Sequence, residues 1–502
     1  MKKVLRKNSI YSLVQAILNI ALIFFTIPIF IRLLGSELYG IFALIMVAGN
    51  LNTFTSLGLT NALVKFIAEQ GRTDESNIDI WVNLLIMAGL SLPLTFLALF
   101  FDKIVLLNIL KIPIEYYDAS KWLYFWLLWA NFLLLIGQTF KSVLDALQKV
   151  YITSVQQIIY NIVYWSFIIV ALLYGFGLSE IGFAIFISAL IWLILTTYSA
   201  LRIWAKFSIV GIKSNFIKST KKQLNFGLQI YTGAVIGFFY EPLSKILISN
   251  FVGISAVGYY DIALKIKGQL WGIISKIFYP LFPFISGQKE TIIIRKYIHD
   301  IEQKAFLLIV PVIALTIILM NMFITLWIGE NNEIISITTI YLVSFNLLGS
   351  ATVIPIYQFL MAKNLVQKTI YLQLTNVIFN IVFFILFVEH LKYNAVIVGN
   401  ITGIMISFLH SLYYQKKYLN SLIFDSYQQL LLIFGAFIFI LISGFIAKSI
   451  SLKSEILSIF LVVLTVFIST IIFYKIFNLI RRDDIIRYLG EGTISKIVCK
   501  IF

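Results

Sequence analysis

Charged side chains within a long apolar stretch are the first feature of this sequence that could do chemistry. At about 100° per residue, six polar or small residues between positions 255 and 286 fall within about 60° of Lys265 on one helical face, whereas Lys267 points away from it. They are Asp261, Lys265, Gly268, Gln269, Gly272 and Lys276. Because glycines leave space beside a helix, this face is predicted to line a ligand cavity. The alternative is that Asp261 and Lys265 neutralise each other while Lys276 extends to the membrane surface.

Two acidic residues of this region could bind a small cation. Glu241 precedes Pro242 in the apolar stretch 223–250, and Lys245 follows Glu241 by four residues. A proline within a helix exposes carbonyl groups that can help to ligate a cation, or it permits bending. Glu241 and Asp261 are therefore predicted to form a proton or sodium site. A structural carboxylate–lysine pair, with Lys245 as the partner, explains the same residues equally well.

Further lysines lie near the ends of other apolar stretches. Lys65 closes the second stretch, which also contains Asn50, and the fourth contains Lys141 with Asp145 four residues later. Lys65, Lys141 and Lys276 are predicted to form a cationic vestibule on the cytoplasmic side. Lysines that only extend to the lipid headgroups would give the same pattern.

The first apolar stretch carries a neutral polar stripe at helical spacing, which consists of Asn8, Ser12, Gln15 and Asn19. Such a stripe either lines a cavity or forms hydrogen bonds between helices. The sequence favours neither interpretation over the other.

The composition requires membrane-spanning helices to position these residues. Of the 502 residues, 60% are hydrophobic and only 12% are charged, and the mean hydropathy is +0.95. A soluble chain carries roughly 25% charged residues. The composition therefore excludes a soluble multidomain enzyme, a coiled coil and a disordered protein, and it predicts an all-α polytopic membrane protein.

About fourteen apolar stretches are long enough to cross roughly 30 Å of hydrocarbon. They are predicted near residues 9–33, 40–66, 80–101, 119–145, 150–176, 179–202, 223–250, 255–286, 297–328, 334–362, 366–389, 394–415, 424–448 and 455–480. Most of the 39 lysines and arginines lie in the two tails and in the connections on the side of the N-terminus. Because basic connections face the cytoplasm, both termini are predicted to be cytoplasmic. Most of the net charge of +16 then reflects topology, and no nucleic-acid partner is expected.

An internal repeat divides the chain. Gly35 and Gly40, after the first stretch, match Gly253 and Gly258 after the seventh, and three further matches recur at offsets of 218 or 219 residues. Equivalent points are separated by an even number of helices, so the two copies are predicted to be parallel repeats. The predicted organisation is an N-lobe (1–206), a basic cytoplasmic linker (207–222), a C-lobe (223–420), two further helices (421–480) and a cytoplasmic tail (481–502). Two lobes around a central cavity are typical of alternating-access transporters.

Motifs for other chemistry are missing from the sequence. The joint from Gly35 to Gly40 has phosphate-loop spacing but lacks the Lys-Ser/Thr that would bind a nucleotide. The three histidines have no metal-ligand spacing, and one cysteine, Cys499, offers neither a disulfide framework nor a thiolate metal site. No outside connection is long enough to fold as a catalytic domain. The sequence therefore predicts a transporter and not an enzyme, with a proton or sodium ion as the coupling ion.

Two segments and one spaced pattern carry a family resemblance. They are RLLGSELYGIFAL from Arg32 to Leu44, VGISAVGYY from Val252 to Tyr260, and the Gln-Lys-x11-Asn-Ile-Val pattern that occurs in both lobes. With these features the chain resembles the polysaccharide transporter family of the MOP superfamily, which contains Wzx-type flippases of lipid-linked oligosaccharides. The resemblance covers essentially the whole chain and implies a MATE-like fold.

The resemblance also implies a substrate and a location. The implied substrate is a polyprenyl diphosphate that carries an oligosaccharide repeat unit, moved to the outer leaflet for O-antigen, capsule or exopolysaccharide synthesis. The implied location is the bacterial cell (inner) membrane, and the implied partners are the lipid bilayer, a polysaccharide polymerase and glycosyltransferases. By analogy, transport is coupled to a proton or sodium gradient.

Cationic cavities are typical of that family, and Lys65, Lys265 and Lys276 are the matching candidates here. Gln269 and Asn50 are further candidates for the cavity. A diphosphate that crosses hydrocarbon must exchange water for fixed cations, which lysines provide as point charges. Family members often carry arginine in the cavity, whereas this sequence has no arginine well inside a predicted span.

Three other function classes compete with a flippase. A MATE-type multidrug or cation antiporter should have a cavity dominated by acidic and aromatic residues, whereas the face around Lys265 has at least as many lysines as carboxylates. A membrane-embedded polymerase or glycosyltransferase would require a large outside loop with paired acids or an Arg and His constellation. A non-catalytic scaffold does not explain two lobes with polar interiors.

Overall fold

The computed structural model describes residues 2–49, 56–204, 207–208, 211–278, 281–329, 333–420, 427–450 and 454–479. Every regular element of these residues is a helix. Eleven of the helices are long and apolar enough to cross a membrane. The predicted spans 223–250 and 255–286 correspond to α8 (Ile212–Phe251) and α9 (Ile254–Ile274), which carry more charge and are not among the eleven. The predicted all-α polytopic membrane protein with about fourteen spans is confirmed.

The packing divides the chain into two compact units, residues 1–261 with 388–393, and residues 262–387 with 394–502. Besides α8 and the start of α9, the first unit contains α1 (Lys2–Gly49), α3 (Leu59–Gln70), α4 (Asp74–Phe100), α5 (Tyr117–Ala146), α6 (Val150–Leu173) and α7 (Leu178–Trp204). The predicted lobes 1–206 and 223–420 are defined by the sequence repeat and stay a prediction, because the packing groups α8 with α3 and α4.

The second unit contains most of α9 and the helices that follow it. These are the 3-10 helix η3 (Ser275–Phe278), α10 (Leu281–Gly287), α11 (Thr291–Ile328), α12 (Glu333–Ala362), most of α13 (Val366–Leu391), α14 (Asn394–Leu419), α15 (Tyr427–Ser449) and α16 (Glu455–Ile476). The single span predicted at 255–286 is wrong in detail, since α9 ends at Ile274 and α10 begins at Leu281. Between these two helices, residues 275–278 form η3, and residues 279–280 lie outside the described residues.

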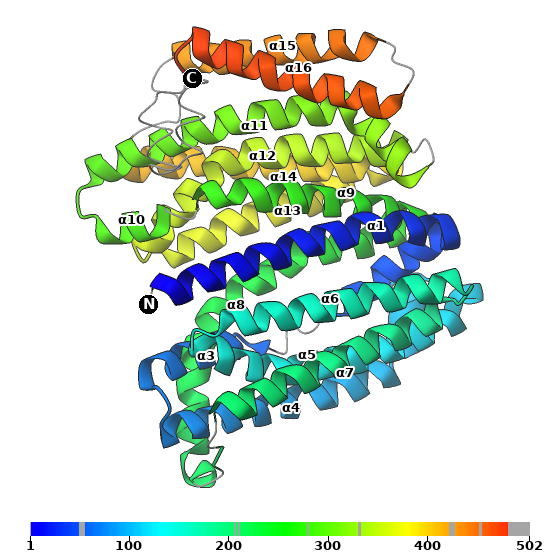
Figure 1. Cartoon of the computed structure of the whole chain (residues 1–502), viewed down its shortest axis with the longest axis vertical. Coiled ribbons are helices and arrows are strands. Elements are labelled where there is room, and N and C mark those ends of the chain that lie inside the picture. The colour runs from blue at the N-terminus through cyan, green and yellow to red at the C-terminus, as the bar shows by residue number, and fades with distance from the viewer. Residues whose placement is uncertain are drawn as a thin grey trace. The chain divides into compact units, whose positions relative to one another are not determined.

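The first unit is a bundle in which α5 packs against α4 and α7, while α6 packs against α1 and α7 (Figure 1). Two short helices, a π-helix (Ile104–Ile109) and a 3-10 helix (Ile114–Tyr116), occupy the connection between α4 and α5. Small residues permit the closest approaches in this unit. A Cβ on Gly227 of α8 would lie 2.6 Å from the carbonyl oxygen of Leu57, so the N-terminal part of α8 can sit directly on the residues before α3 only with glycine at this position.

The glycine joints of the sequence repeat contact each other in the first unit. Gly35 and Gly253 both have positive φ, of 81° and 129°, so the right-handed helical path is interrupted at the two equivalent points. A Cβ on Gly40 would overlap the carbonyl of Ile254, and a Cβ on Gly258 would lie 2.9 Å from the carbonyl oxygen of Ser36. The equivalent glycines are thus used in equivalent ways, as expected for a duplicated segment.

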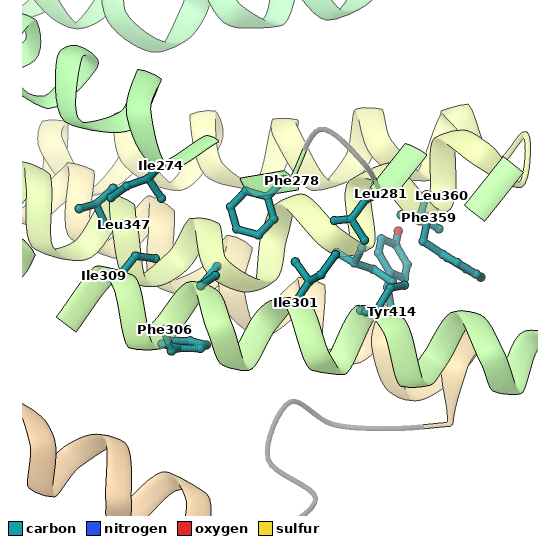
Figure 2. Packing of buried hydrophobic residues seen from close by; sticks show 14 of the residues in the cluster. Ile274, Phe278, Leu281, Ile301, Phe306, Ile309, Leu347, Phe359, Leu360 and Tyr414 are labelled. Carbon is teal, nitrogen blue, oxygen red and sulfur yellow. The ribbon is translucent and has the colours of Figure 1, made fainter. Parts of the chain in front are cut away.

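The core of the second unit is an apolar cluster between α11, α12 and the segment from α9 to α10. Figure 2 shows Phe278 and Leu281 facing Ile301 of α11 and Phe359 of α12. The two C-terminal helices cover the opposite part of α11 through Ile318, Ile440 and Val462.

Candidate functional site

The first unit contains a polar cavity of about 350 Å³. This volume lies within the roughly 300–1,000 Å³ that is typical of small-molecule sites. The lining residues come from four segments of the chain and are Ser56, Thr60, Leu134, Leu135, Gln138, Gln157, Tyr160 and Trp192. The described lining contains hydroxyl, amide and aromatic groups and no charged side chain.

The wall formed by Trp192 is fixed by close packing. Trp192 is 2% exposed, and a Cβ on Gly137 of α5 would overlap its ring, so the indole lies directly on the α5 backbone. Tyr160 of α6 meets Trp192 edge to face, with ring centroids 6.3 Å apart. Gly137 therefore sets how far the aromatic wall projects into the cavity.

The amide wall is held by hydrogen bonds between α6 and α1. Gln157 donates through Nε2 to Asn161 Oδ1 at 3.1 Å, and Asn161 donates through Nδ2 to Asn19 Oδ1 at 3.1 Å. Nearer the N-terminus of α1, Asn8 and Ser12 form hydrogen bonds with residues at or just before the start of α6. The polar stripe of α1 thus joins helices, and the bond through Asn161 extends to Gln157 in the cavity wall.

The predicted coupling residue Asp261 forms a buried ion pair in the first unit. Its Oδ1 accepts from Lys245 Nζ at 2.5 Å, and its Oδ2 accepts from the Tyr39 hydroxyl at 2.7 Å. Tyr39 and Asp261 are 1% and 5% exposed. Lys245 is thus bonded to Asp261, sixteen residues away, which provides the cation that a buried carboxylate requires.

A second buried network joins α4, α5 and α8. Asp79, which is 1% exposed, accepts from Ser219 Oγ at 2.6 Å and from Lys222 Nζ at 2.7 Å. Asn83, which is fully buried, donates to Gln223 at 2.8 Å and accepts from Thr139 at 2.9 Å. Because each of these polar groups has partners, the network fixes α8 against the bundle at little desolvation cost.

Lys222 is the charged end of this network and lies just outside the predicted span 223–250. Burial of the ammonium favours its neutral form, but hydrogen bonds to Asp79 and Glu75 and the negative charge of these two groups outweigh that effect. The pKa of Lys222 is therefore raised above its ordinary value. Lys222 stays charged at neutral pH and is not a free cation for a ligand.

The other predicted lysines are distributed over both units. Lys65 Nζ lies 4.1 Å from the centroid of the Phe226 ring and 3.9 Å from Glu69, and its side chain is 41% exposed. In the second unit, Lys265 and Gln269 are half-buried and Lys276, on η3, is exposed. Asn50 lies outside the described residues. The proposed shared role of these residues remains a prediction.

The glycine-thinned face of α9 is open. The described part of the chain places no atom within 4 Å of a Cβ built on Gly268 or Gly272. This space is compatible with the predicted cavity face that contains Lys265 and Gln269.

Lys141 and Asp145 form a local ion pair. Their Nζ and Oδ2 atoms are 2.5 Å apart, and Asp145 Oδ1 also accepts from Thr153 of α6 at 2.8 Å. Asp145 thus links α5 to α6. The role of this pair beside a substrate is untested.

The sequence prediction does not include Asp79, Asn83 or Gln223. The sequence did contain a signal for them. Asp79 and Asn83 are four residues apart, and Lys222 and Gln223 stand at the start of an apolar stretch. Their partners are about 140 residues away, a distance over which helical periodicity gives no information. No group of three or more His, Cys, Asp or Glu residues in the described ranges could hold a metal ion.

The fold is shared with solved structures of a lipid II flippase and of MATE transporters. A structure of the lipid II flippase MurJ in an inward closed conformation has a TM-score of 0.74 at 18% identity and covers 94% of this chain and 99% of its own. An inward-facing MATE multidrug transporter has a TM-score of 0.63 at 14% identity and covers 81% of this chain and 94% of its own. The Vibrio cholerae MATE transporter VcmN, in its bent form, has a TM-score of 0.57 at 15% identity and covers 84% and 98%.

The sequence gives the family. A family model described as polysaccharide biosynthesis protein matches residues 5–289, so the chain belongs to that family of polysaccharide biosynthesis proteins. No curated protein matches the chain significantly. The family match thus confirms the predicted polysaccharide family, and the shared fold confirms the predicted MATE-like fold.

Proposed function

We propose that this protein is a flippase that moves a polyprenyl-diphosphate-linked oligosaccharide from the cytoplasmic to the outer leaflet. The translocated unit would supply synthesis of O-antigen, capsule or another exopolysaccharide. Membership in a polysaccharide biosynthesis family and a fold shared with a lipid II flippase support this function. The bacterial inner membrane, with both termini cytoplasmic, is the setting proposed for it.

The observation that carries the proposal is the chemistry of the cavity in the first unit. Gln138 and Gln157 both donate and accept hydrogen bonds, as a sugar hydroxyl requires, and Tyr160 and Trp192 offer aromatic faces. A neutral lining suits an uncharged saccharide better than it suits an ion. We assign the saccharide headgroup to this cavity.

The diphosphate requires cations that the saccharide does not. Lys65, Lys265 and Lys276 are proposed for this role, with Gln269 and Asn50 as neighbouring polar contacts. Lysines act as point charges, so they can follow a moving diphosphate without the fixed bidentate geometry of arginine. The polyprenyl tail can stay in lipid while the headgroup passes through the protein.

Coupling to a proton or sodium gradient is proposed through Glu241 and Asp261. Asp261 already accepts from Lys245 and Tyr39, so cation binding there would have to displace the Lys245 ammonium. We expect Glu241→Gln or Asp261→Asn to abolish the effect of the gradient on transport. Unchanged gradient dependence in both variants would refute this assignment.

A MATE-type multidrug or cation antiporter is the second candidate, because two of the similar structures are MATE transporters. Organic cations are bound by carboxylates and aromatic rings. The described cavity lining has two aromatic residues and no carboxylate, which disfavours this candidate. A polysaccharide polymerase or glycosyltransferase is disfavoured by the connection between α4 and α5, which forms only two short helices.

The function can be tested in a bacterial strain that lacks its own flippase and accumulates lipid-linked oligosaccharide on the cytoplasmic face. The wild-type protein should restore surface polysaccharide. Lys265→Ala should not restore it, whereas Lys448→Ala, on α15, is the matched control and should. Rescue by Lys265→Ala at the wild-type level would refute the role of Lys265 in binding the diphosphate. If the expressed wild-type protein restores no surface polysaccharide in any glycan background, the flippase proposal is contradicted.

A further inference from the structure

Three acidic side chains are almost fully buried in the described part of the chain, and one of them differs from the others. Asp79, Asp261 and Glu302 are 1%, 5% and 1% exposed. Asp79 pairs with Lys222, and Asp261 pairs with Lys245. Glu302, in α11 of the second unit, has no lysine, arginine or histidine partner among the described residues and is hydrogen-bonded to Gln415 of α14.

The Glu302–Gln415 pair lacks one donor. Gln415 Nε2 donates to Glu302 Oε1, while Gln415 Oε1 has no hydrogen-bond partner although Gln415 is only 1% exposed. An ionised carboxylate only accepts hydrogen bonds, so it cannot satisfy this oxygen. A protonated carboxyl group carries an O–H that can. Protonation therefore supplies the one donor that the pair is missing.

The surroundings of Glu302 are apolar. Ile298, Ile301 and Ala305 flank it on α11, and Tyr414 and Leu419 flank Gln415 on α14, all within the core cluster of Figure 2. Burial of an unpaired carboxylate in such a place is strongly unfavourable, and the group neutralises instead. Asp79 and Asp261 avoid that cost through their lysines.

Charged groups on the helices around α11 make their bonds elsewhere. On α11 itself, Asp300 pairs with Lys304 at 2.6 Å and His299 contacts Gln303. On α15 and α16, Lys448 and Tyr474 donate to the backbone carbonyls of Ile318 and Leu307.

The other titratable groups on the surrounding helices include phenols, lysines and His410 of α14, which bonds to Thr375 of α13. Lys267 of α9 is buried, whereas Lys416 and Lys417 of α14 are exposed. Tyr357 of α12 and Tyr418 of α14 pack against the apolar cluster, and Lys276 of η3 is exposed. Among the described residues, the Gln415 amide is the hydrogen-bond partner of the Glu302 carboxyl group.

We propose that Glu302 is a proton-binding site of the second unit, in addition to Glu241 and Asp261. In the state described here it holds a proton, which its O–H donates to Gln415 Oε1. When a rearrangement of α11 and α14 admits water, the carboxyl group releases this proton to water and is left as a carboxylate. The link of this release to transport rests on the proposed flippase function, whereas proton binding does not.

Infrared spectroscopy of the protein reconstituted in lipid tests proton binding directly. At neutral pH, exposed carboxyl groups are ionised, so the wild type should retain a carbonyl band of a protonated carboxylic acid. Glu302→Gln should abolish this band, and the matched control Asp300→Asn should leave it unchanged. Gln415→Leu should shift the band, because it removes the hydrogen-bond partner. Absence of the band in the wild type, or its persistence in Glu302→Gln, would overturn the proposal.

A second measurement tests the link to transport. Glu302→Gln keeps a neutral side chain that can pair with Gln415, so it should fold and still flip substrate without a pH gradient. The stimulation of flipping by a pH gradient should be lost. If the infrared band has been assigned to Glu302 and this variant still shows full stimulation, the coupling role is overturned and the proton-binding site stands. A wild type that shows the band but flips no lipid-linked saccharide would refute the flippase and leave the proton site in place.

Discussion

The indole ring of Trp192 lies on the backbone of Gly137, so closely that any side chain at residue 137 would force the ring to move. Trp192 also forms a wall of the cavity in the first unit. One position without a Cβ therefore determines the width of the proposed saccharide site.

Gly137→Ala should push Trp192 toward the cavity and reduce transport. The overpacking should also cost about 1–3 kcal/mol of stability. Gly89→Ala is the control, because a Cβ there meets no described atom within 4 Å. Flipping in proteoliposomes and thermal unfolding in detergent measure the two effects. Equal transport by both variants would mean that Trp192 does not limit the site.

Removal of Lys222 and removal of Asp79 should destabilise the protein to different extents. Lys222→Met leaves the buried Asp79 carboxylate without its cation and should destabilise the protein by about 3 kcal/mol. Asp79→Asn should cost less, because Lys222 is 24% exposed and keeps Glu75 as a partner. Thermal unfolding of the two variants measures the difference. A larger loss for Asp79→Asn would contradict this account of the network.

The same pair predicts how stability depends on pH. Because the pKa of Lys222 is raised in the folded state, its contribution is fully present below the ordinary pKa of 10.5 and is lost as the pH rises through the folded-state value. Between pH 6 and 9, roughly, the stability difference between wild type and Lys222→Met should be constant. It should shrink in strongly alkaline solution. A difference that already disappears near neutral pH would show that Lys222 is not held as a cation.

Tyr39→Phe should weaken the ion pair of Asp261. The hydroxyl donates to Asp261 at 2.7 Å, and a hydrogen bond to a charged group contributes about 1.5–3 kcal/mol. We expect a loss of stability of that size, with Lys245 still in place. Tyr11→Phe, on an exposed residue of α1, is the matched control. Equal unfolding temperatures for the two variants would contradict a buried hydrogen bond at Tyr39.

The sequence predicted the helices well because each membrane-spanning helix needs an apolar stretch of its own. For example, the spans expected at 119–145 and 334–362 agree with α5 and α12 to within two residues. The glycine joints at Gly35 and Gly253 were also recognisable, since positive φ favours glycine. The break after Ile274 was missed because the stretch is apolar on both sides of Pro280.

The site was predicted less completely because pairing between distant helices is not encoded in local periodicity. Helical spacing suggested Lys265 as the neighbour of Asp261, whereas the structure bonds Asp261 to Lys245 and Tyr39. Likewise, Glu302 is inconspicuous in sequence because Asp300 and Lys304 surround it with ordinary surface charge. Its separation from cations is visible only in three dimensions.

Flipping of a labelled lipid-linked oligosaccharide by the purified protein in proteoliposomes tests the central claim most directly. The wild type should flip polyprenyl-diphosphate oligosaccharide faster than the bare polyprenyl diphosphate. A variant with Gln138→Leu and Gln157→Leu should lose this preference while both lipids still move. Equal rates for the two lipids in the wild type would contradict a saccharide site in the first unit, and the absence of flipping of either lipid would contradict the flippase function itself.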